Sequence, residues 1–274
     1  MVKWDICQAV EEDGAWVWER LSWPVLQEAA KRGAVVVVPL GATEQHGPHL
    51  PAGTDTLIAS ELALRAAQRA SVPVVVGPVL NLGYSAHHRH LPGTVSLRPD
   101  TLAGVVADVC RSVRSHGFRR IFVLNAHGGN APFLDASVAL LAEERIYVAA
   151  AAWWAFCAEA LERELESELG GASHACELET SVLLTLAPSL VGEDRVLELS
   201  RPETRWGWFD FRAAGRGVAS FPITGLTRSR SGVYGDPSRA SESKGERIVE
   251  EAVRQIAAFL SDLHEWQPET KEHE

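Results

Sequence analysis

The feature that most constrains how this chain folds is the run Ala34–Leu40, in which every residue is apolar and four valines follow one another. A strand with this composition is apolar on both faces, which is typical of a central strand in a parallel sheet covered by helices. Similar β-branched or apolar runs predict three further strands, at residues 72–76, 120–124 and 147–152.

Segments with helical spacing of apolar residues separate these strands. We expect helices at about residues 56–70, 100–116, 133–145 and, near the end of the chain, 241–263. The alternation predicts an α/β fold, a single-domain three-layer α/β/α sandwich with a mostly parallel sheet, over residues 1–274. The stretch 197–237 is rich in glycine, arginine and aromatic residues, and we interpret it as an excursion that covers a site or a subunit contact.

Charge and hydropathy exclude several classes of protein. The chain has 26 basic and 36 acidic residues, a formal charge of −10, which disfavours binding to nucleic acid. Its longest apolar run, residues 146–158, is shorter than the roughly 20 residues that span a membrane. The N-terminus has no hydrophobic signal core, and the 4 cysteines form no C-x-x-C pair. We therefore expect a cytoplasmic protein with no membrane or nucleic-acid partner.

Polar, glycine-rich segments follow the first and third expected strands. The first segment contains Glu44, His46 and Asp55, and the second contains His127. Ligands of open α/β sheets bind beyond the carboxyl ends of the strands, where both segments begin. Glu44 and His46 are two residues apart, so in an extended backbone their side chains point the same way. Two carboxylates and two imidazoles suit Zn, Mn or Fe(II), and we predict a metal site there.

Each of these residues also has a simpler interpretation. Asp55 fits a helix cap, and His127 fits a loop histidine with ordinary hydrogen bonds. The combination of all four residues on two glycine-rich turns favours the metal site over these alternatives.

The sequence resembles the creatininase family of metal-dependent amidohydrolases. The matching motifs occur in the family order and cover about residues 30 to 260. They are Glu44–His49 with Asp55, Leu91–Leu97, Asn125–Asn130, His174–Ser181, and Gly235–Pro237 with Lys244–Glu246. The resemblance implies two divalent metal ions per chain and a homo-oligomer, with a hexamer expected.

The resemblance also implies how the ions are held. Glu44, Asp55 and His127 would bind one ion, while His46 and the bridging Asp55 would bind the other. Creatinine-hydrolysing members have a further glutamate ligand two residues after the motif histidine, where this chain has Gly129. We expect a glutamate from another segment to replace it.

The segment His174–Ser181 offers two glutamates for that role. Residues 174 and 177 can share one helical face, whereas residues 177 and 179 cannot. We therefore predict that His174 and Glu177 face the site and that Glu177 completes the second metal position. For Glu179 we expect a role in orienting a ligand or supporting the loop, with a buried salt bridge as the alternative. The resemblance implies proton transfer by His174, whose alternative role is stacking or hydrogen bonding within a loop.

The expected reaction is hydrolysis of a C–N bond, other than a peptide bond, in a small-molecule amide by a metal-activated water. A nucleophilic Cys176 is disfavoured, because the neighbouring carboxylate would raise its pKa. The residues that enclose creatinine in creatininases match Gly128 and Gly170 here, while Trp154 matches a family tryptophan. Smaller groups at these positions indicate a larger or linear substrate.

Other side chains could bind such a substrate. His88 and its neighbours His87, Arg89 and His90 precede the Pro-Gly turn and could contact an anionic group, although they could equally be solvated loop residues. The aromatic residues of the excursion could line a pocket or an oligomer contact; they are Trp206, Trp208, Phe209 and Phe211.

Three alternatives stay open. Branches of the family include a mycofactocin-pathway peptidase and a deformylase, whose histidine motifs are closer to the one here. The same fold could also act on a non-amide bond. A non-catalytic metal-binding scaffold is the third alternative, which the intact set of four candidate ligands disfavours.

Overall fold

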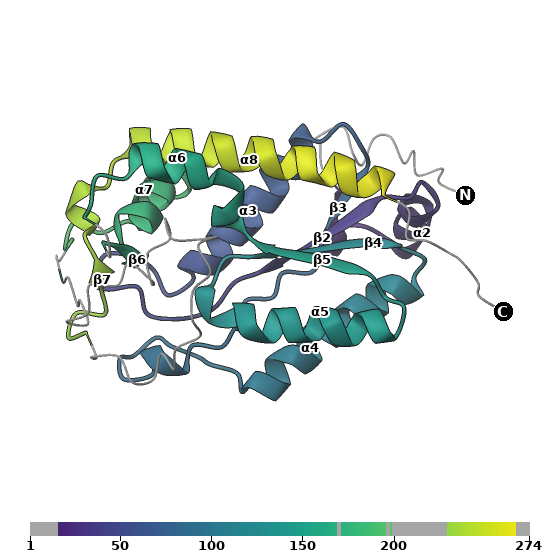
Figure 1. The fold of residues 1–274 in the computed structure, drawn as a ribbon, viewed down its shortest axis with the longest axis horizontal. Coiled ribbons are helices and arrows are strands. Elements are labelled where there is room, and N and C mark those ends of the chain that lie inside the picture. Colours follow the sequence, from purple (N-terminus) through teal and green to yellow (C-terminus); the bar gives the residue numbers. More distant parts are fainter. Residues whose placement is uncertain (1–15, 169–170, 196–197, 199–228, 267–274) are drawn as a thin grey trace.

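A parallel five-stranded sheet runs through the centre of the molecule (Figure 1). The computed structural model describes residues 16–168, 171–195, 198 and 229–266. In spatial order the strands are β1 (Trp16–Val17), β3 (Val74–Val76), β2 (Val35–Leu40), β4 (Arg120–Asn125) and β5 (Val148–Ala152). The observed α/β architecture with a parallel sheet confirms the predicted fold class.

Strand β2 occupies the middle of the sheet, and all its residues are buried. Its register with β4 pairs Val35 with Arg120 at one end and Leu40 with Asn125 at the other. The two strands therefore end level with each other, so the polar segments that follow them start from the same edge of the sheet.

Helices cover both faces of the sheet (Figure 1). One face carries α3 (Thr54–Arg69), α6 (Ala158–Glu164), α7 (Glu177–Leu186) and α8 (Glu242–Glu265). The other face carries α4 (Pro99–Ser115) and α5 (Ala131–Glu143), and α2 (Trp23–Lys31) adds to the apolar core on that side. Strand alternation divides the valines of β2 between the two cores, with Val35 and Val37 on the first face and Val36 and Val38 on the second.

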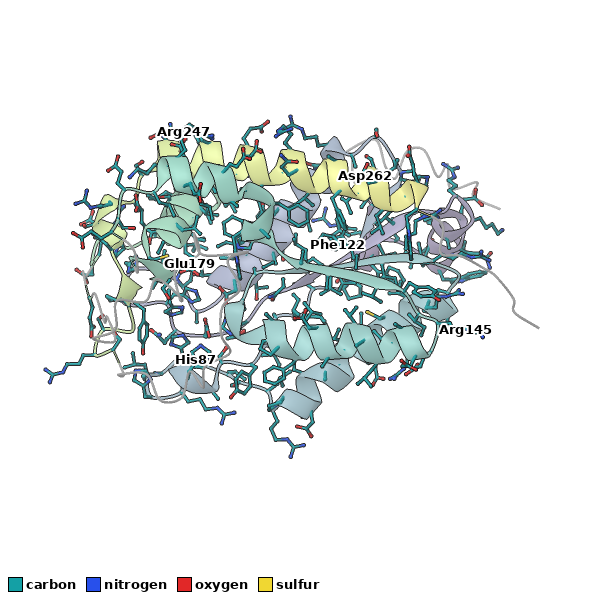
Figure 2. The ribbon with its side chains drawn as sticks, viewed as in Figure 1. His87, Phe122, Arg145, Glu179, Arg247 and Asp262 are labelled. Atoms are coloured by element: carbon teal, nitrogen blue, oxygen red, sulfur yellow. The ribbon has the colours of Figure 1, made fainter. Side chains whose placement is uncertain are left out.

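Short elements gather beyond the carboxyl ends of the strands. They are η2 (Ala86–His88), η3 (Gly128–Asn130), η4 (Trp153–Cys157) and an antiparallel pair, β6 (Ala172–His174) with β7 (Tyr234–Gly235). Figure 2 shows Glu179 and His87 at this end of the molecule, while Arg145 lies at the opposite end. The other short helices within the described ranges are η1 (Trp18–Arg20), η5 (Pro188–Leu190) and η9 (Pro237–Arg239).

The expected strands and helices all occur, with ends shifted by one or two residues. The expected elements do not include β1, α2 or α6, which have only 2, 9 and 7 residues. Among the described residues no helix is both long and apolar enough to span a membrane.

Candidate metal centre

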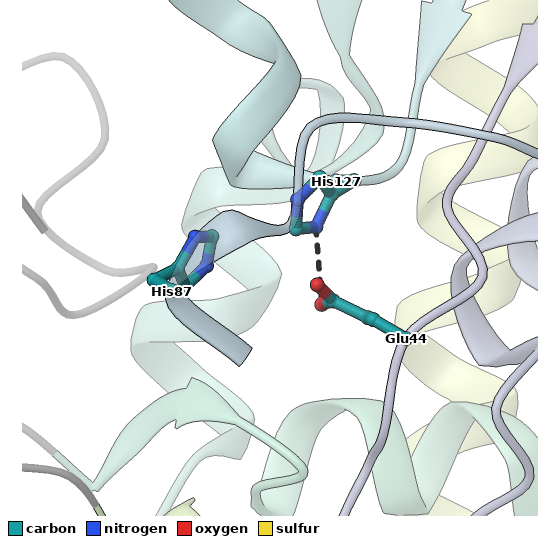
Figure 3. Close-up of side chains that lie close together, drawn as sticks. All are labelled: Glu44, His87 and His127. Atoms are coloured by element: carbon teal, nitrogen blue, oxygen red, sulfur yellow. Dashed lines mark ion pairs between the residues drawn. The ribbon is translucent and has the colours of Figure 1, made fainter. Parts of the chain in front are cut away.

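The four side chains predicted as metal ligands meet beyond the carboxyl edge of the sheet. His46 Nε2 lies 3.2 Å from Asp55 Oδ1. His127 Nδ1 lies 3.1 Å from Glu44 Oε1 and 3.2 Å from Asp55 Oδ2 (Figure 3 shows the contact with Glu44). All four side chains are buried, and His127, the most exposed of these residues, is 5% accessible. Asp55 thus directs one oxygen to each histidine.

Local backbone structure brings these residues together. Glu44 is held by a hydrogen bond from its backbone N–H to the carbonyl oxygen of Ala52, which folds the glycine-proline loop back towards α3. Asp55 lies in the first turn of α3. His127 follows β4 directly, and Asn125 fixes its backbone, since the Asn125 amide donates to the His127 carbonyl oxygen at 2.8 Å and accepts from its N–H at 3.1 Å.

The outer nitrogens of both imidazoles face backbone carbonyls. His46 Nδ1 lies 3.1 Å from the carbonyl oxygen of Glu44, and His127 Nε2 lies 2.8 Å from that of Tyr84. A carbonyl oxygen can only accept, so these nitrogens carry the hydrogen. In the neutral tautomer that binds a cation, the other nitrogen, which faces the carboxylates, has no hydrogen; second-layer hydrogen bonds impose this arrangement on metal-binding histidines.

Several buried polar atoms of the cluster lack a well-aligned hydrogen bond within the described part of the chain. They are both carboxylate oxygens of Glu44, Asp55 Oδ2 and His46 Nε2. Unsatisfied buried polar atoms are costly, and buried charges normally have a partner or coordinate a metal. The donor set therefore fits a divalent cation.

The pKa shifts of the cluster residues also indicate that its carboxylates favour a nearby positive charge. Burial opposes ionisation of Glu44, but His127 and other nearby histidines outweigh it and hold its pKa well below the usual range. Burial lowers the pKa of His46, yet Asp55 and a second carboxylate outweigh it and raise this pKa well above the usual value. The pKa of His127 is raised in the same way by Glu44 and Asp55 against the effect of burial. Without a cation, protons on these histidines balance the carboxylates.

Helix α7 contributes a third carboxylate, that of Glu179. Its Oε1 lies 3.8 Å from His46 Nε2, and its Oε2 lies 3.8 Å from the Cys176 thiol sulfur. His46, Asp55 and Glu179 are all buried and offer ligand atoms within 4.8 Å of one another. Burial raises the pKa of Glu179, although His46 opposes the shift.

The expectation that Glu177 acts at the metal site is corrected by the structure. Its carboxylate accepts from Lys244 Nζ at 2.6 Å and from the backbone N–H groups of Glu166 and Ser167 at 3.0 and 2.8 Å. These donors satisfy the fully buried charge, so Glu177 secures the start of α7 and is absent from the candidate metal clusters of the described residues.

His174, predicted to transfer a proton, lies against the cluster. Its Nε2 lies 2.8 Å from the carbonyl oxygen of Gln45 and therefore carries the hydrogen. Its Nδ1 faces Glu44 Oε1 at 3.5 Å. Burial together with neighbouring His88 and His46 holds the pKa of His174 well below the usual value. The neutral ring therefore directs an unprotonated nitrogen into the site.

The side chain of Gln45, which the sequence analysis overlooked, orients His88. Gln45 Oε1 accepts from the N–H of Gly47 at 3.0 Å, which fixes the orientation of the amide. Its Nε2 then donates to His88 Nδ1 at 2.9 Å and to the Gly232 carbonyl oxygen at 3.0 Å. Burial lowers the pKa of His88 to about 3, so the ring is neutral and its hydrogen is on Nε2, 3.9 Å from Glu44 Oε1. The only sequence signal for Gln45 was its position between two candidate ligands.

His87 approaches the cluster from the same short helix, η2. Its ring is stacked on that of His127, with centroids 5.8 Å apart and an interplanar angle of 5°. Glu44, His87 and His127 form a further group that could hold a cation, and Figure 3 shows His87 beside the other two.

The other predicted substrate-binding residues do not belong to the candidate metal clusters of the described residues. Trp154 is half-buried in η4 and packs against the core formed with α3 and α8. Gly128 is exposed, and a Cβ added there would meet no atom within 4 Å. Gly170 and the four aromatic residues of the excursion, Trp206, Trp208, Phe209 and Phe211, lie outside the described residues.

Fold and site together define an α/β protein with a buried carboxylate–imidazole centre suited to divalent cations. A model of the creatininase family, described as creatinine amidohydrolase, matches residues 19–260. The chain belongs to the creatininase family.

Individual relatives agree with this assignment. The mycofactocin precursor peptide peptidase of Mycolicibacterium smegmatis is 35% identical over 246 residues, which cover 86% of each chain. The creatinine amidohydrolase of Pseudomonas putida is 32% identical over 259 residues, which cover 88% of this chain and 95% of the relative. A solved structure described as "Creatininase Mn" superposes with a TM-score of 0.75 at 29% identity, covering 90% of this chain and 98% of the other. A mutant creatininase structure is described as "Zn-Zn type".

Proposed function

We propose that this protein is a metal-dependent amidohydrolase that cleaves a C–N bond of a small amide with an activated water. The observation that carries the proposal is the buried cluster in which one ring nitrogen of His46 faces Asp55 at 3.2 Å and one ring nitrogen of His127 faces Glu44 at 3.1 Å. Manganese or zinc is the expected cation, in keeping with the descriptions of solved creatininases.

The diverging oxygens of Asp55 support two cation positions. Glu44, Asp55 Oδ2 and His127 would hold one ion, and His46 with Asp55 Oδ1 would hold the other. Two such ions, when bound, lower the pKa of water and polarise the carbonyl of the scissile bond.

His174 is the proposed proton-transfer residue. Its unprotonated Nδ1 can accept the proton of the attacking water, while the carbonyl of Gln45 holds the opposite N–H. The protonated ring can then deliver that proton to the leaving nitrogen. These two proton transfers require a histidine that has a free lone pair before the reaction begins, and the hydrogen bonds of His174 provide one.

His88 is the proposed hydrogen-bond donor to the substrate. Gln45 assigns the hydrogen of the neutral ring to Nε2, which points towards the carboxylate of Glu44. A donor in this position can bind the carbonyl or carboxylate oxygen of a substrate and strengthen as negative charge develops there.

Two substrate classes are supported by different observations. A small-molecule amide agrees with the family description and with the creatinine amidohydrolase relative. A short peptide agrees with the mycofactocin precursor peptide peptidase, and the open space beside exposed Gly128 leaves room for a longer chain. An assay should therefore first compare hydrolysis of small amides with hydrolysis of short peptides.

The homo-oligomer expected from the resemblance stays a prediction.

The test combines cation loading with a substrate panel. The chelated protein is reloaded with manganese or zinc and assayed on formamides, lactams, linear amides and short peptides. We expect cation-dependent hydrolysis of at least one class. Binding of cations without hydrolysis of any member would instead support the non-catalytic scaffold.

A further inference from the structure

We infer that Glu179 is a ligand of the second cation position, together with His46 and Asp55. The inference rests on the proposed metal site but concerns a residue outside the four predicted ligands. Glu179 would supply the acidic ligand that is missing at Gly129.

The geometry of the second position is incomplete without Glu179. His46 and Asp55 supply one nitrogen and one oxygen, 3.2 Å apart, and His46 Nε2 is buried without a hydrogen-bond partner among the described residues. Divalent zinc takes at least three protein ligands in the sites where it activates water. The Glu179 carboxylate, whose Oε1 is 3.8 Å from that nitrogen, provides the third.

The surroundings of Glu179 differ from those of an ordinary buried carboxylate. The residue is only 5% exposed, and its hydrogen-bonding and ion-pair neighbours in the described ranges are the His46 ring and the Cys176 thiol. Among the described residues no lysine or arginine forms an ion pair with it. Two other carboxylates, Glu44 and Asp55, lie close enough to disfavour its charge. A cation is the partner that balances these three carboxylates together.

The backbone excludes a ligand at Gly129. A Cβ at this position would collide with the carbonyl oxygen of Tyr84 and with the His127 ring. An acidic side chain there would displace His127, a ligand of the first position. Glu179 instead reaches the second position from a separate element, α7, where its Oε1 lies 3.8 Å from His46 Nε2.

The chain offers a matched control two residues away. Glu179→Gln and Glu177→Gln each remove one negative charge from a buried glutamate in the first turn of α7. Both variants and the wild type are loaded with manganese, dialysed, and analysed for cations per folded chain by elemental analysis, with circular dichroism as the check of folding. We expect two ions in the wild type and in Glu177→Gln, and one in Glu179→Gln, with affinity for the second ion reduced about 100-fold or more.

The outcomes separate this inference from the proposed function. Two tightly bound ions in Glu179→Gln would overturn the role of Glu179 while leaving the metal site intact. A wild type that binds no cation would overturn the proposed function as well. If Glu179→Gln does not fold, anomalous diffraction of the manganese-loaded wild type decides: an ion bonded to a Glu179 oxygen supports the inference, and an ion bound without it contradicts it.

Discussion

Two buried charged clusters lie at opposite sides of the first turn of α7, and they differ in the source of their positive charge. Glu177 is neutralised by Lys244 and two backbone N–H groups, all from the chain itself. Glu179 belongs to a cluster of three carboxylates whose described neighbours are histidines, and two of these direct their outer nitrogen at a backbone carbonyl and their inner nitrogen at the carboxylates.

The difference separates structural from functional charge. A buried ion pair complete within the chain stabilises one arrangement. Removal of one partner lowers the stability of the fold, because the other charge is left buried without a partner. A buried cluster short of positive charge is a poor way to stabilise a fold but a good way to bind a cation. Substitutions in the cluster around Asp55 and Glu179 should therefore reduce cation binding, whereas substitutions in the cluster around Glu177 and Lys244 should reduce stability.

The largest effect is expected from Asp55→Asn. The two Asp55 oxygens face the two histidines, so the substitution weakens both cation positions at once. We expect hydrolysis to fall by about 10³-fold or more, because the activated water is lost. Steady-state kinetics and elemental analysis measure the effect, and a variant that keeps both ions and full activity would contradict the assignment.

The second largest effect is expected from Lys244→Met, on stability alone. Lys244 is nearly buried and bonded to Glu177 and to the carbonyl oxygen of Arg239. Its removal leaves the Glu177 charge uncompensated, which costs about 3–5 kcal/mol. Urea unfolding should show this loss, while the folded variant keeps its cations. Cation loss at unchanged stability would place Glu177 at the metal site after all.

The fold was predictable because its signals are local. The buried valines of β2 and the apolar spacing of α8 mark their elements within one or two residues. The helix α2 was missed because it is only 9 residues long, although its apolar residues Val25, Leu26, Ala29 and Ala30 recur at helical spacing and pack against the core.

The choice between Glu177 and Glu179 was not predictable in the same way. Both lie in the first turn of α7, and helical spacing shows only that they face different directions. The pairing of Glu177 with Lys244, a residue 67 positions further along the chain, distinguishes this glutamate from the one that faces the histidines. Without the packing of α8 against α7, nothing in the spacing identifies the glutamate that already has a partner.

Cation removal should make the stability of the protein depend on pH. In the cation-free fold the pKa values of His46 and His127 are raised, so the stability from their protons is complete below about pH 6.5 and is lost as the pH rises through the folded-state values. Each unit of raised pKa is worth about 1.4 kcal/mol. We expect the Tm of the chelated protein to fall from pH 6 to pH 9, and the Tm of the manganese-loaded protein to resist this fall. Parallel curves with and without cations would contradict the prediction.

A smaller effect is expected from His88→Ala, which leaves the cation ligands in place. Loss of the N–H donor should lower kcat by about 10- to 100-fold, with unchanged cation content. His90→Ala is the matched control, because His90 bonds to the Ser229 carbonyl oxygen and faces no carboxylate of the cluster at ion-pair distance. Equal losses in both variants would indicate a general effect on the loop.

The smallest effect is expected from the double variant Glu177→Gln with Lys244→Met. A glutamine oxygen can still accept from the N–H groups of Glu166 and Ser167, and methionine fills the space of the lysine stem without a charge. A buried ion pair replaced as a unit is often nearly neutral for stability, so the double variant should recover most of the loss caused by Lys244→Met and remain within about 1–2 kcal/mol of the wild type. Urea unfolding of the two single variants and the double variant measures this coupling. No uncharged exchange is expected to restore the cluster around Asp55 in this way, because its proposed partner is a cation and not another side chain. A double variant as unstable as Lys244→Met would show that the two clusters are less distinct than their contacts indicate.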